Sequence, residues 1–440
     1  MWKYLGFGNN FRPKLPSRNW SIFLAITGSF TAAVIYDKRE TKRVQRKWCK
    51  LVEHIAKEPL DPRAMPRRLT VFLEAPPADG LRAAQDHFKL YVKPILVASG
   101  LDWEFIQGRK EGDIRAELAE RIRRERTPVD ERLDVDEVED ARKRAGVIEY
   151  NGPQGDIVMG RHTWKEYVRG LHEGWLGPLT EPPKPVIEEP LKEESVPEPV
   201  LETLPGITIH STASEELLPP ATETSKEEEK PKNAPKPAPF ISTADYTSAS
   251  LPAELPTQFS PSTPIEFPHI LGFLNTPRRL YRFLNRRVMA DEIGRETAAI
   301  ILGSARPYHT TSSISDISTS QSEDGSSTNA AQTEQESALS WEEKEWHKSI
   351  RKHVENEPER TWLEPIVLDE RIASRMRRFE ITTEEEEKSK GIFVPEIEVE
   401  GWIKGGLRSL GRSAIDAIGM GDKVKIKSGA EMGMEGDEDS

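Results

Sequence analysis

The chain has 440 residues, 34 prolines and a mean hydropathy of -0.62, a composition that predicts that only part of it folds. The formal net charge of -12 excludes a general attraction to nucleic acid, because phosphate binding depends on clustered Lys and Arg. The single cysteine, Cys49, excludes an intramolecular disulfide and cysteine-based metal sites. We therefore expect one or two modest cores separated by polar segments.

The N-terminal residues are basic. The sequence contains no Asp or Glu before Asp37. Positive charge in this stretch comes from Lys3, Arg12, Lys14 and Arg18. Because this bias is typical of a mitochondrial targeting region, we interpret residues 1–19 as a basic N-terminal segment.

Residues 20–36 (WSIFLAITGSFTAAVIY) carry no charge and have an aromatic residue at each end. An uncharged apolar run of this length is about the minimum for a membrane-spanning helix, and its aromatic ends suit the two interfaces. We predict a single transmembrane helix at 20–36, followed by a basic juxtamembrane connector at 37–66. The predicted anchor residues are Trp20, Phe23, Leu24, Ile26, Phe30, Val34, Ile35 and Tyr36.

Two other interpretations of residues 20–36 fit less well. A cleaved secretory signal would explain the small residues at 31–33, but the apolar run exceeds the usual signal core and a dense basic stretch follows it. A surface-lying amphipathic helix requires a polar face, which this segment lacks. Charge leaves the orientation open, because the Lys and Arg residues at 38–50 match or exceed those before the anchor.

The next region has the pattern of an α/β domain. Apolar, β-rich runs at 69–73, 103–107 and 147–150 predict strands. Helical periodicity links them: one helix ends at Gly100 and is kinked or broken at Pro94, and a second stops before Thr127–Pro128. A third helix follows, with Thr163 and Glu166 in a capping-box pattern. This order predicts a parallel sheet with helical crossovers over residues 67–180.

The remainder alternates between polar tracts and short elements. Residues 181–264 are rich in Pro and Glu and predict a disordered insert, and the Ser/Thr-rich stretch 308–339 predicts a second. Between them, 265–307 predicts a helical segment, with Thr276 as N-cap and an end near Gly303. C-terminal α/β additions are expected at 340–420: a helix from Ser340, a strand at 365–368 and a helix at 369–379. Residues 421–440 predict a disordered tail.

Motifs for chemistry are mostly absent from the sequence. The nine histidines show no local metal-ligand spacing, and neither a P-loop nor a G-x-S-x-G elbow occurs, so we expect no metal, cofactor or catalytic residue. The loops at 74–80 and 151–156 follow the first and third predicted strands, where an open parallel sheet binds ligands. Each loop is acidic and contains proline, which removes a backbone donor, so both suit a triphosphate poorly.

The segments at 68–76, 91–103 and 111–115 resemble the first half of the diacylglycerol-kinase-like fold, and the acylglycerol kinases are a close comparison. In that family an Asn-Pro loop ends the first strand and a Gly-Gly-Asp-Gly-Thr loop binds nucleotide phosphates. This chain has Glu74–Pro76 and 151–156 in those places, without the Gly-Asp-Gly-Thr spacing. The resemblance implies a kinase-like fold with degenerate nucleotide loops. The vestigial loop positions would be Pro76, Asp79, Gly80, Gly152, Gly155 and Asp156.

A second resemblance covers more of the chain. The segments at 15–20, 91–94, 160–167, 368–371 and 377–379 look like the fungal fifty-four-kilodalton Tim subunit family. This resemblance implies a subunit of the carrier translocase of the mitochondrial inner membrane, single-pass, with its large C-terminal region in the intermembrane space. Implied partners are the channel subunit, other translocase subunits, small Tim chaperones, carrier-protein substrates and inner-membrane lipid, but not nucleic acid.

Three functions remain open at this point. The first is a non-catalytic scaffold that supports insertion of multi-spanning carrier proteins. The second is a membrane-anchored lipid kinase, and the third is a lipid-binding module that keeps the apolar cleft of the kinase-like fold without catalysis. The loop at 151–156 separates the first two, and lipid held in the cleft would favour the third.

Overall fold

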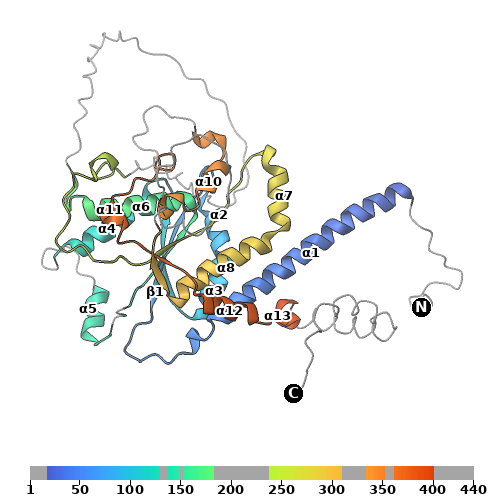
Figure 1. Ribbon diagram of the computed structural model, residues 1–440, viewed down its shortest axis with the longest axis horizontal. Coiled ribbons are helices and arrows are strands. Elements are labelled where there is room, and N and C mark those ends of the chain that lie inside the picture. Colours follow the sequence, from blue (N-terminus) through green and yellow to red (C-terminus); the bar gives the residue numbers. More distant parts are fainter. Residues whose placement is uncertain are drawn as a thin grey trace, which may run out of the picture.

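Figure 1 shows the computed structural model, which describes residues 17–128, 137–148, 150, 152–182, 237–309, 333–351 and 361–400. Most of the basic N-terminal segment, large parts of both predicted inserts and the predicted tail at 421–440 lie outside these residues.

The predicted anchor is the N-terminal half of one long helix. Helix α1 spans Arg18–Val52, 35 residues, and is the helix among the described residues that is long and apolar enough to cross a membrane. All eight predicted anchor residues lie in it and are exposed, except Val34, which is half-buried. Beyond Tyr36 the same helix enters the body and buries Trp48 and Val52. The first part of the predicted connector is therefore packed helix.

A four-stranded parallel sheet forms the centre of the body. The strands are β1 (Arg68–Glu74), β2 (Asp102–Gly108), β3 (Asp156–Met159) and β4 (Ser262–Ile265), in the order β2-β1-β3-β4. The predictions of strands at 69–73 and 103–107 and of a parallel α/β fold are confirmed. Because the chain passes from β1 to β2 on one side and then to β3 on the other, the order reverses between β1 and β3.

The prediction of a third strand at 147–150 is wrong. Ile148 forms only an isolated parallel bridge with Ala64, and the strand that pairs with β1 begins at Asp156. The physical reason is that β3 gains pairing on both sides, from β1 and β4, whereas Ile148 remains exposed. The loop at 151–156 therefore precedes a strand and lies at the amino edge of the sheet.

The first crossover is a continuous helix with a local bulge. It consists of α2 (Leu81–His87), the π-helical turn η3 (Phe88–Val92) and α3 (Lys93–Ser99), and Gly100 ends it with φ 69°. Pro94 lies at the first turn of α3, directly after the π turn. Since a π turn changes which backbone groups pair, the missing N–H of Pro94 does not end the helix.

The next crossovers contain α4 (Asp113–Arg126), α5 (Glu137–Arg144) and α6 (Gly160–Leu176). The predicted stop before Thr127–Pro128 is confirmed. The predicted capping box is wrong, because α6 begins at Gly160 and Thr163 is buried inside the helix. Tertiary partners of Glu166, described below, replace the predicted local cap.

The prediction that the insert is disordered as far as residue 264 is wrong for its last part. Residues 237–264 are described and include the turn η5 (Thr243–Asp245) and three residues of β4. Arg115 donates to the Pro237 carbonyl, and Arg371 donates to the carbonyls of Tyr246 and Ala249 at 2.7 and 2.9 Å. These distant arginines satisfy backbone groups that the local composition leaves unpaired.

The C-terminal elements depart further from prediction. The predicted helix at 276–303 divides at Asn285 into α7 (Thr276–Leu284) and α8 (Arg286–Leu302). The predicted strand at 365–368 is absent from the described structure. The predicted helix at 369–379 is reduced to the short α11 (Glu370–Ala373). It is followed by β6 (Arg377–Phe379), which pairs with β5 (Ala305–Pro307). The remaining elements are η2 (Ile55–Lys57), η6 (Phe273–Asn275), α9 (Glu334–Ser337), α10 (Ser340–Glu345), η8 (Lys348–Arg351), α12 (Thr383–Gly391) and α13 (Glu396–Glu400).

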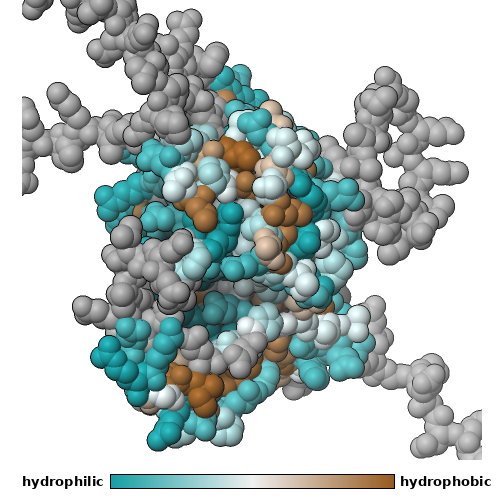
Figure 2. All heavy atoms as spheres, turned by 90° about the vertical axis from the view of Figure 1, so that its left-hand side faces the viewer, coloured by the Kyte–Doolittle hydropathy of each residue, from teal (hydrophilic) through white to brown (hydrophobic). Residues whose placement is uncertain are grey.

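Helices cover both faces of the sheet (Figure 1). The C-terminal half of α1 packs with α3 and α8 over one face, and α4 and α6 cover the other. The side of the body that includes α4 and α11 carries mostly hydrophilic residues, with apolar residues in separate patches (Figure 2). This layering leaves the carboxyl edge of the strands as the place to look for a ligand site.

Candidate functional site at the carboxyl edge of the sheet

The carboxyl ends of β1 and β3 meet where the strand order reverses, the usual ligand position in an open α/β sheet. Glu74 ends β1, and Gly160 opens α6 directly after β3. Gly160 has φ 83°, and a Cβ there would lie 2.8 Å from the His162 ring. The chain therefore turns tightly from strand to helix and places His162 beside Glu74, with its Nε2 3.3 Å from the Glu74 carbonyl oxygen.

The amino end of α4, a potential phosphate site, is capped from within the protein. The backbone N–H groups of Gly112 and Arg115 donate to the two oxygens of the Glu166 carboxylate. Asp113 accepts from the N–H groups of Arg109 and Lys110, both at 2.9 Å. These amides are consequently occupied by side-chain carboxylates.

The amino end of α6 is capped in the same way. The N–H of Arg161 donates to one oxygen of Glu342 at 2.7 Å, and the N–H of Phe267 donates to the other at 2.7 Å. Glu342 belongs to α10, so a C-terminal segment reaches across this edge. The Lys165 ammonium donates to the carbonyls of Trp362 and Glu364, which adds a second C-terminal segment.

Burial shifts the protonation of this cluster. Burial, and then the neighbouring carboxyl Glu166, raise the pKa of Glu74 well above its ordinary value. Burial raises the pKa of Glu166 to about 7, although its bonds to Glu74 and to backbone amides lower it. Burial also raises the pKa of Glu342 to about 7 and lowers that of His162 to about 3. The edge thus combines acids that resist ionisation with a neutral histidine.

The predicted loop positions are divided between the two edges of the sheet. Pro76, Asp79 and Gly80 lie after β1, where the Gly80 N–H donates to Asp79 at 2.7 Å and Asp79 faces His269 at 3.4 Å. Gly152 and Gly155 lie before β3 and Asp156 is its first residue, so all three are at the amino edge. The two predicted loops therefore do not form one site.

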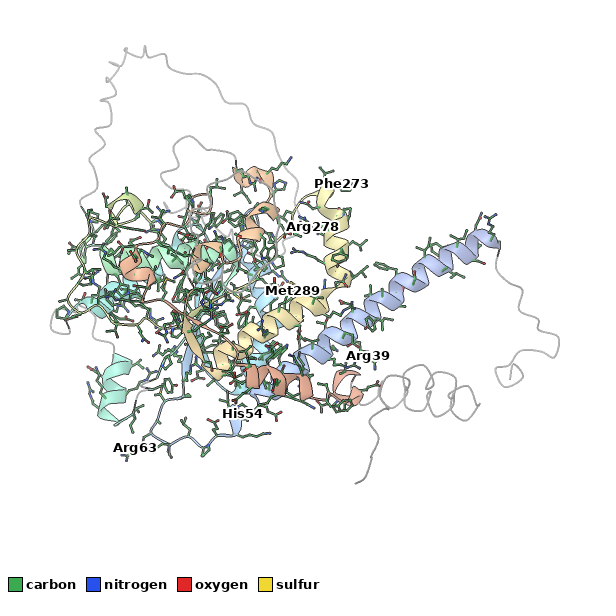
Figure 3. All side chains as sticks on the ribbon, in the orientation of Figure 1. Arg39, His54, Arg63, Phe273, Arg278 and Met289 are labelled. Atoms are coloured by element: carbon green, nitrogen blue, oxygen red, sulfur yellow. The ribbon has the colours of Figure 1, made fainter. Side chains whose placement is uncertain are left out.

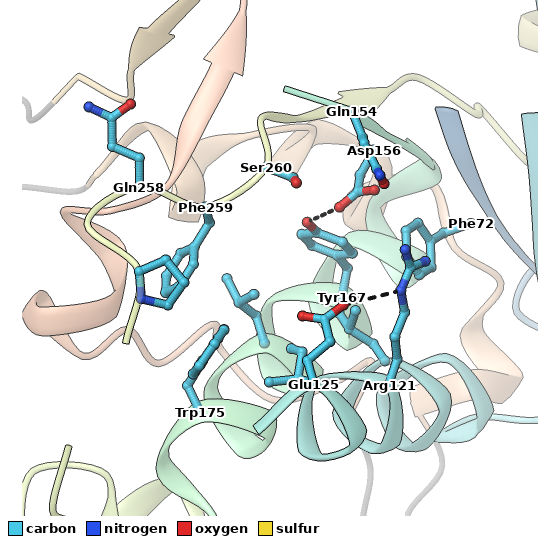
Figure 4. A pocket seen from close by; sticks show the side chains of 14 residues that line it. Phe72, Arg121, Glu125, Gln154, Asp156, Tyr167, Trp175, Gln258, Phe259 and Ser260 are labelled. Carbon is cyan, nitrogen blue, oxygen red and sulfur yellow. Dashed lines mark hydrogen bonds and ion pairs between the residues drawn. The ribbon is translucent and has the colours of Figure 1, made fainter. Parts of the chain in front are cut away.

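Asp156 instead lines a cavity of about 190 Å³ between α4, α6 and the segment at 256–260 (Figure 4). It accepts a hydrogen bond from the Tyr167 hydroxyl at 2.7 Å, and burial raises its pKa to about 6. The rings of Trp175 and Phe259 stack at 5.5 Å along the same cavity. Ligand pockets usually measure about 300–1,000 Å³, so this space is small for a lipid.

Sequence reasoning placed Glu74 in a loop at the ligand edge but missed the other acids there. Glu166 and His162 lie within a segment that resembles a known family, but Glu166 was assigned to a local cap. Glu342 lies more than 170 residues further along the chain, and only the fold brings it to its partner Arg161. Among the residues that the structure describes, no group of three His, Cys, Asp or Glu side chains could hold a metal ion.

Comparison with known proteins identifies the family. Residues 1–379 match the family model described as inner membrane protein import complex subunit Tim54. The chain belongs to this family. The predicted resemblance to the fungal fifty-four-kilodalton Tim subunits is therefore confirmed.

Curated members of the family are named mitochondrial import inner membrane translocase subunit Tim54. The member from Aspergillus fumigatus is 51% identical over 394 residues, which cover 84% of this chain and 88% of the relative. The member from Neurospora crassa is 47% identical, with 91% of this chain and 84% of the relative covered. The member from Candida albicans is 30% identical, with 84% and 94% covered. The family thus consists of subunits of an inner-membrane import complex.

Proposed function

We propose that the chain is a non-catalytic scaffold subunit of the carrier translocase, anchored in the mitochondrial inner membrane by the N-terminal half of α1. Its role is to support insertion of multi-spanning carrier proteins. The observation that carries the proposal is the two-part structure of α1: its first half is exposed and, after Arg18, uncharged, and its second half is packed into the body.

The exposed half fits a bilayer. At about 1.5 Å per residue, the stretch from Arg18 to Tyr36 is about 28 Å long, close to the thickness of the hydrocarbon core. A soluble helix would not leave Trp20, Phe23 and Ile26 more than half exposed. We infer a retained single-pass anchor, because the helix that contains it continues into the core.

The packed half holds the body in a fixed orientation. The carboxylate of Asp37 accepts from the N–H groups of Arg286 and Arg287 at 3.2 and 3.3 Å and so caps α8. The Trp48 indole donates to Asp291 at 2.8 Å, and Lys47 pairs with the same carboxylate. A body tied to its anchor along a helix can present the same surfaces to neighbouring subunits at all times.

The carboxyl edge supports the absence of catalysis. A nucleotide would require free amide donors and positive charge there, whereas Glu166, Glu342 and Asp113 already accept from the amides. The cationic groups of Arg161 and Lys165 pair with Glu343. We propose that the kinase-like loops are degenerate. Within the described residues, this edge gives no support to the lipid-kinase alternative or to the lipid-binding module.

We place the large C-terminal region in the intermembrane space, as family resemblance implies. Its proposed partners there are the channel subunit, other translocase subunits, small Tim chaperones and the carrier proteins themselves. Inner-membrane lipid surrounds the anchor.

Cross-linking mass spectrometry on the complex isolated from mitochondria in mild detergent tests the proposal. We expect cross-links from lysines of the body to the channel subunit or to small Tim chaperones. Cross-links to matrix proteins alone would reverse the orientation, and a chain that isolates without other translocase subunits would refute the scaffold role. Binding of ATP and magnesium to the purified full chain would contradict the non-catalytic part.

A further inference from the structure

Helix α7 and the turn η6 before it carry a large apolar surface that the described protein leaves uncovered. No residue of either element is buried. Phe273 and Leu274 are each 89% exposed, and Tyr281 is 69% exposed. Contiguous exposed apolar side chains of this size mark a surface that something outside the chain covers.

The helix has two distinct faces. At about 100° per residue, Pro277, Leu280, Tyr281 and Leu284 fall on one side of α7. The opposite side carries Arg278, Arg279 and Arg282. Such a helix, apolar on one side and arginine-rich on the other, has the pattern of an element that lies in a membrane interface.

The basic side is turned toward the body. Arg282 pairs with the buried carboxylate of Glu345 in α10 at 2.7 Å, and Arg278 lies 3.6 Å from the same group. The Arg282 guanidinium also lies over the Trp341 ring. Figure 1 shows α10 on one side of α7 and the exposed half of α1 on the other. Leu280 and Leu284 therefore face away from α10, whereas Tyr281 lies at the border and lines a cavity of about 370 Å³ together with Arg282 and Trp341.

The position of α7 along α1 coincides with the end of the predicted anchor. At the α7–α8 junction, Arg287 lies over the ring of Tyr36, the last residue of the uncharged stretch. The Asp37 carboxylate binds the first amides of α8. Figure 3 shows Phe273 at the end of α7 remote from α8, so the helix extends outward from the level at which α1 would leave the bilayer.

We propose that η6 and α7 lie on the surface of the bilayer that α1 crosses, with their apolar side chains among the acyl chains. The inference rests on the proposed membrane anchor. We assign the uncovered side of α7 to a bilayer because it begins at the same position along α1 at which the uncovered half of α1 ends. The exposed Arg286 lies at this junction, where lipid phosphates would be its partners. The side of the body shown in Figure 2 is mostly hydrophilic, and its apolar residues lie in separate patches.

The test uses the full chain in vesicles of phosphatidylcholine and phosphatidylglycerol, with an environment-sensitive fluorophore on one introduced cysteine. The background is Cys49→Ser, which removes the buried native thiol. The probe is placed in turn at Leu274→Cys, at Ile26→Cys in the anchor and at Phe393→Cys. Phe393 is a matched control because it is 80% exposed but lies beside Lys50, about 21 Å along α1 from Tyr36.

We expect the Leu274 probe to show blue-shifted emission and strong quenching by lipids with a shallow spin label. The Ile26 probe should respond most to a deep label, and the Phe393 probe should behave as if in water. A Leu274 probe that remains in water while the Ile26 probe is quenched would overturn the inference and leave the anchor intact. If the Ile26 probe also remains in water, the anchor itself is refuted. Quenching of all three probes would show non-specific adsorption of the body and would also overturn the inference.

Discussion

Buried carboxylates occur in two regions of the body and have opposite surroundings. Between α4 and α6, Glu173 lies between the guanidinium groups of Arg115 and Arg123, with Arg123 at 2.6 Å. At the carboxyl edge, the charges that act most strongly on Glu74 are those of other carboxyl groups, with Glu166 first. One region compensates its buried charge with cations, and the other compensates it with backbone amides and retained protons.

The difference shows what each region does. The Glu173 cluster holds residues 237–240 in place: Glu173 also accepts from the Phe240 N–H at 3.1 Å, and Arg115 donates to the Pro237 carbonyl. It therefore fixes the returning chain against α4 and α6. The carboxyl edge uses acids where a phosphate would sit, so it closes the ligand position of the fold with the protein's own side chains.

The largest effect is expected from Glu173→Gln, which leaves two buried guanidinium groups without their carboxylate. Breaking a buried ion pair costs about 3–5 kcal/mol, so the free energy of unfolding should fall by that order. Urea denaturation of the full chain in detergent measures it. Glu104→Gln is the control, because the Arg68–Glu104 pair is exposed on both sides and should change stability by less than about 1 kcal/mol. Equal losses of unfolding free energy in the two variants would contradict a stabilising role of the Glu173 cluster.

A smaller effect is expected from Glu342→Gln. The amide retains one acceptor oxygen, so one of the two buried N–H groups of Arg161 and Phe267 loses its partner. An unsatisfied buried donor costs about 1–3 kcal/mol, measured by the same denaturation. Glu385→Gln is the matched control: Glu385 accepts from the exposed Thr382 N–H in a capping box, which Gln also supports. If the control lost as much unfolding free energy as Glu342→Gln, the burial of the Glu342 contacts would not account for their contribution to stability.

Local patterns predicted the elements whose stability is local. The uncharged run at 20–36, the apolar runs of β1 and β2 and the stop at Thr127 are properties of neighbouring residues, and the structure has them at those places. The parallel arrangement followed from their alternation with helices. The predicted membership of an inner-membrane translocase came from the family resemblance and not from any local pattern.

Elements held by distant partners could not be predicted in this way. β4 contains Pro264 within a proline-rich tract, but it is an edge strand, where a missing N–H is tolerated. The acids of the carboxyl edge are brought together by the fold from β1, α6 and α10. Sequence alone placed Glu74 in a strand-end loop and Glu166 in a local cap, and it assigned no role to Glu342.

The smallest and most specific effect concerns pH. Burial raises the pKa of Glu74 in the native state well above 4.5. As pH rises through about 4.5, the unfolded chain therefore releases a proton that the native state still holds. The free energy of unfolding should therefore fall with rising pH above about 4.5. Glu74→Gln removes this proton, so the variant should equal the wild type near pH 4 and become more stable than it toward pH 8.

Glu334 supplies the control with the opposite sign. Despite the burial that raises it, hydrogen bonding to Arg306 and the charge of Arg378 lower the pKa of Glu334 to about 2. Its stabilisation is present above about pH 4.5 and is lost as pH falls toward 2. Glu334→Gln should therefore be less stable than the wild type at pH 7 and approach it in acid. If Glu74→Gln also lost stability at pH 7 and regained it in acid, Glu74 would be an ionised, compensated carboxylate, and the carboxyl edge would resemble the Glu173 cluster.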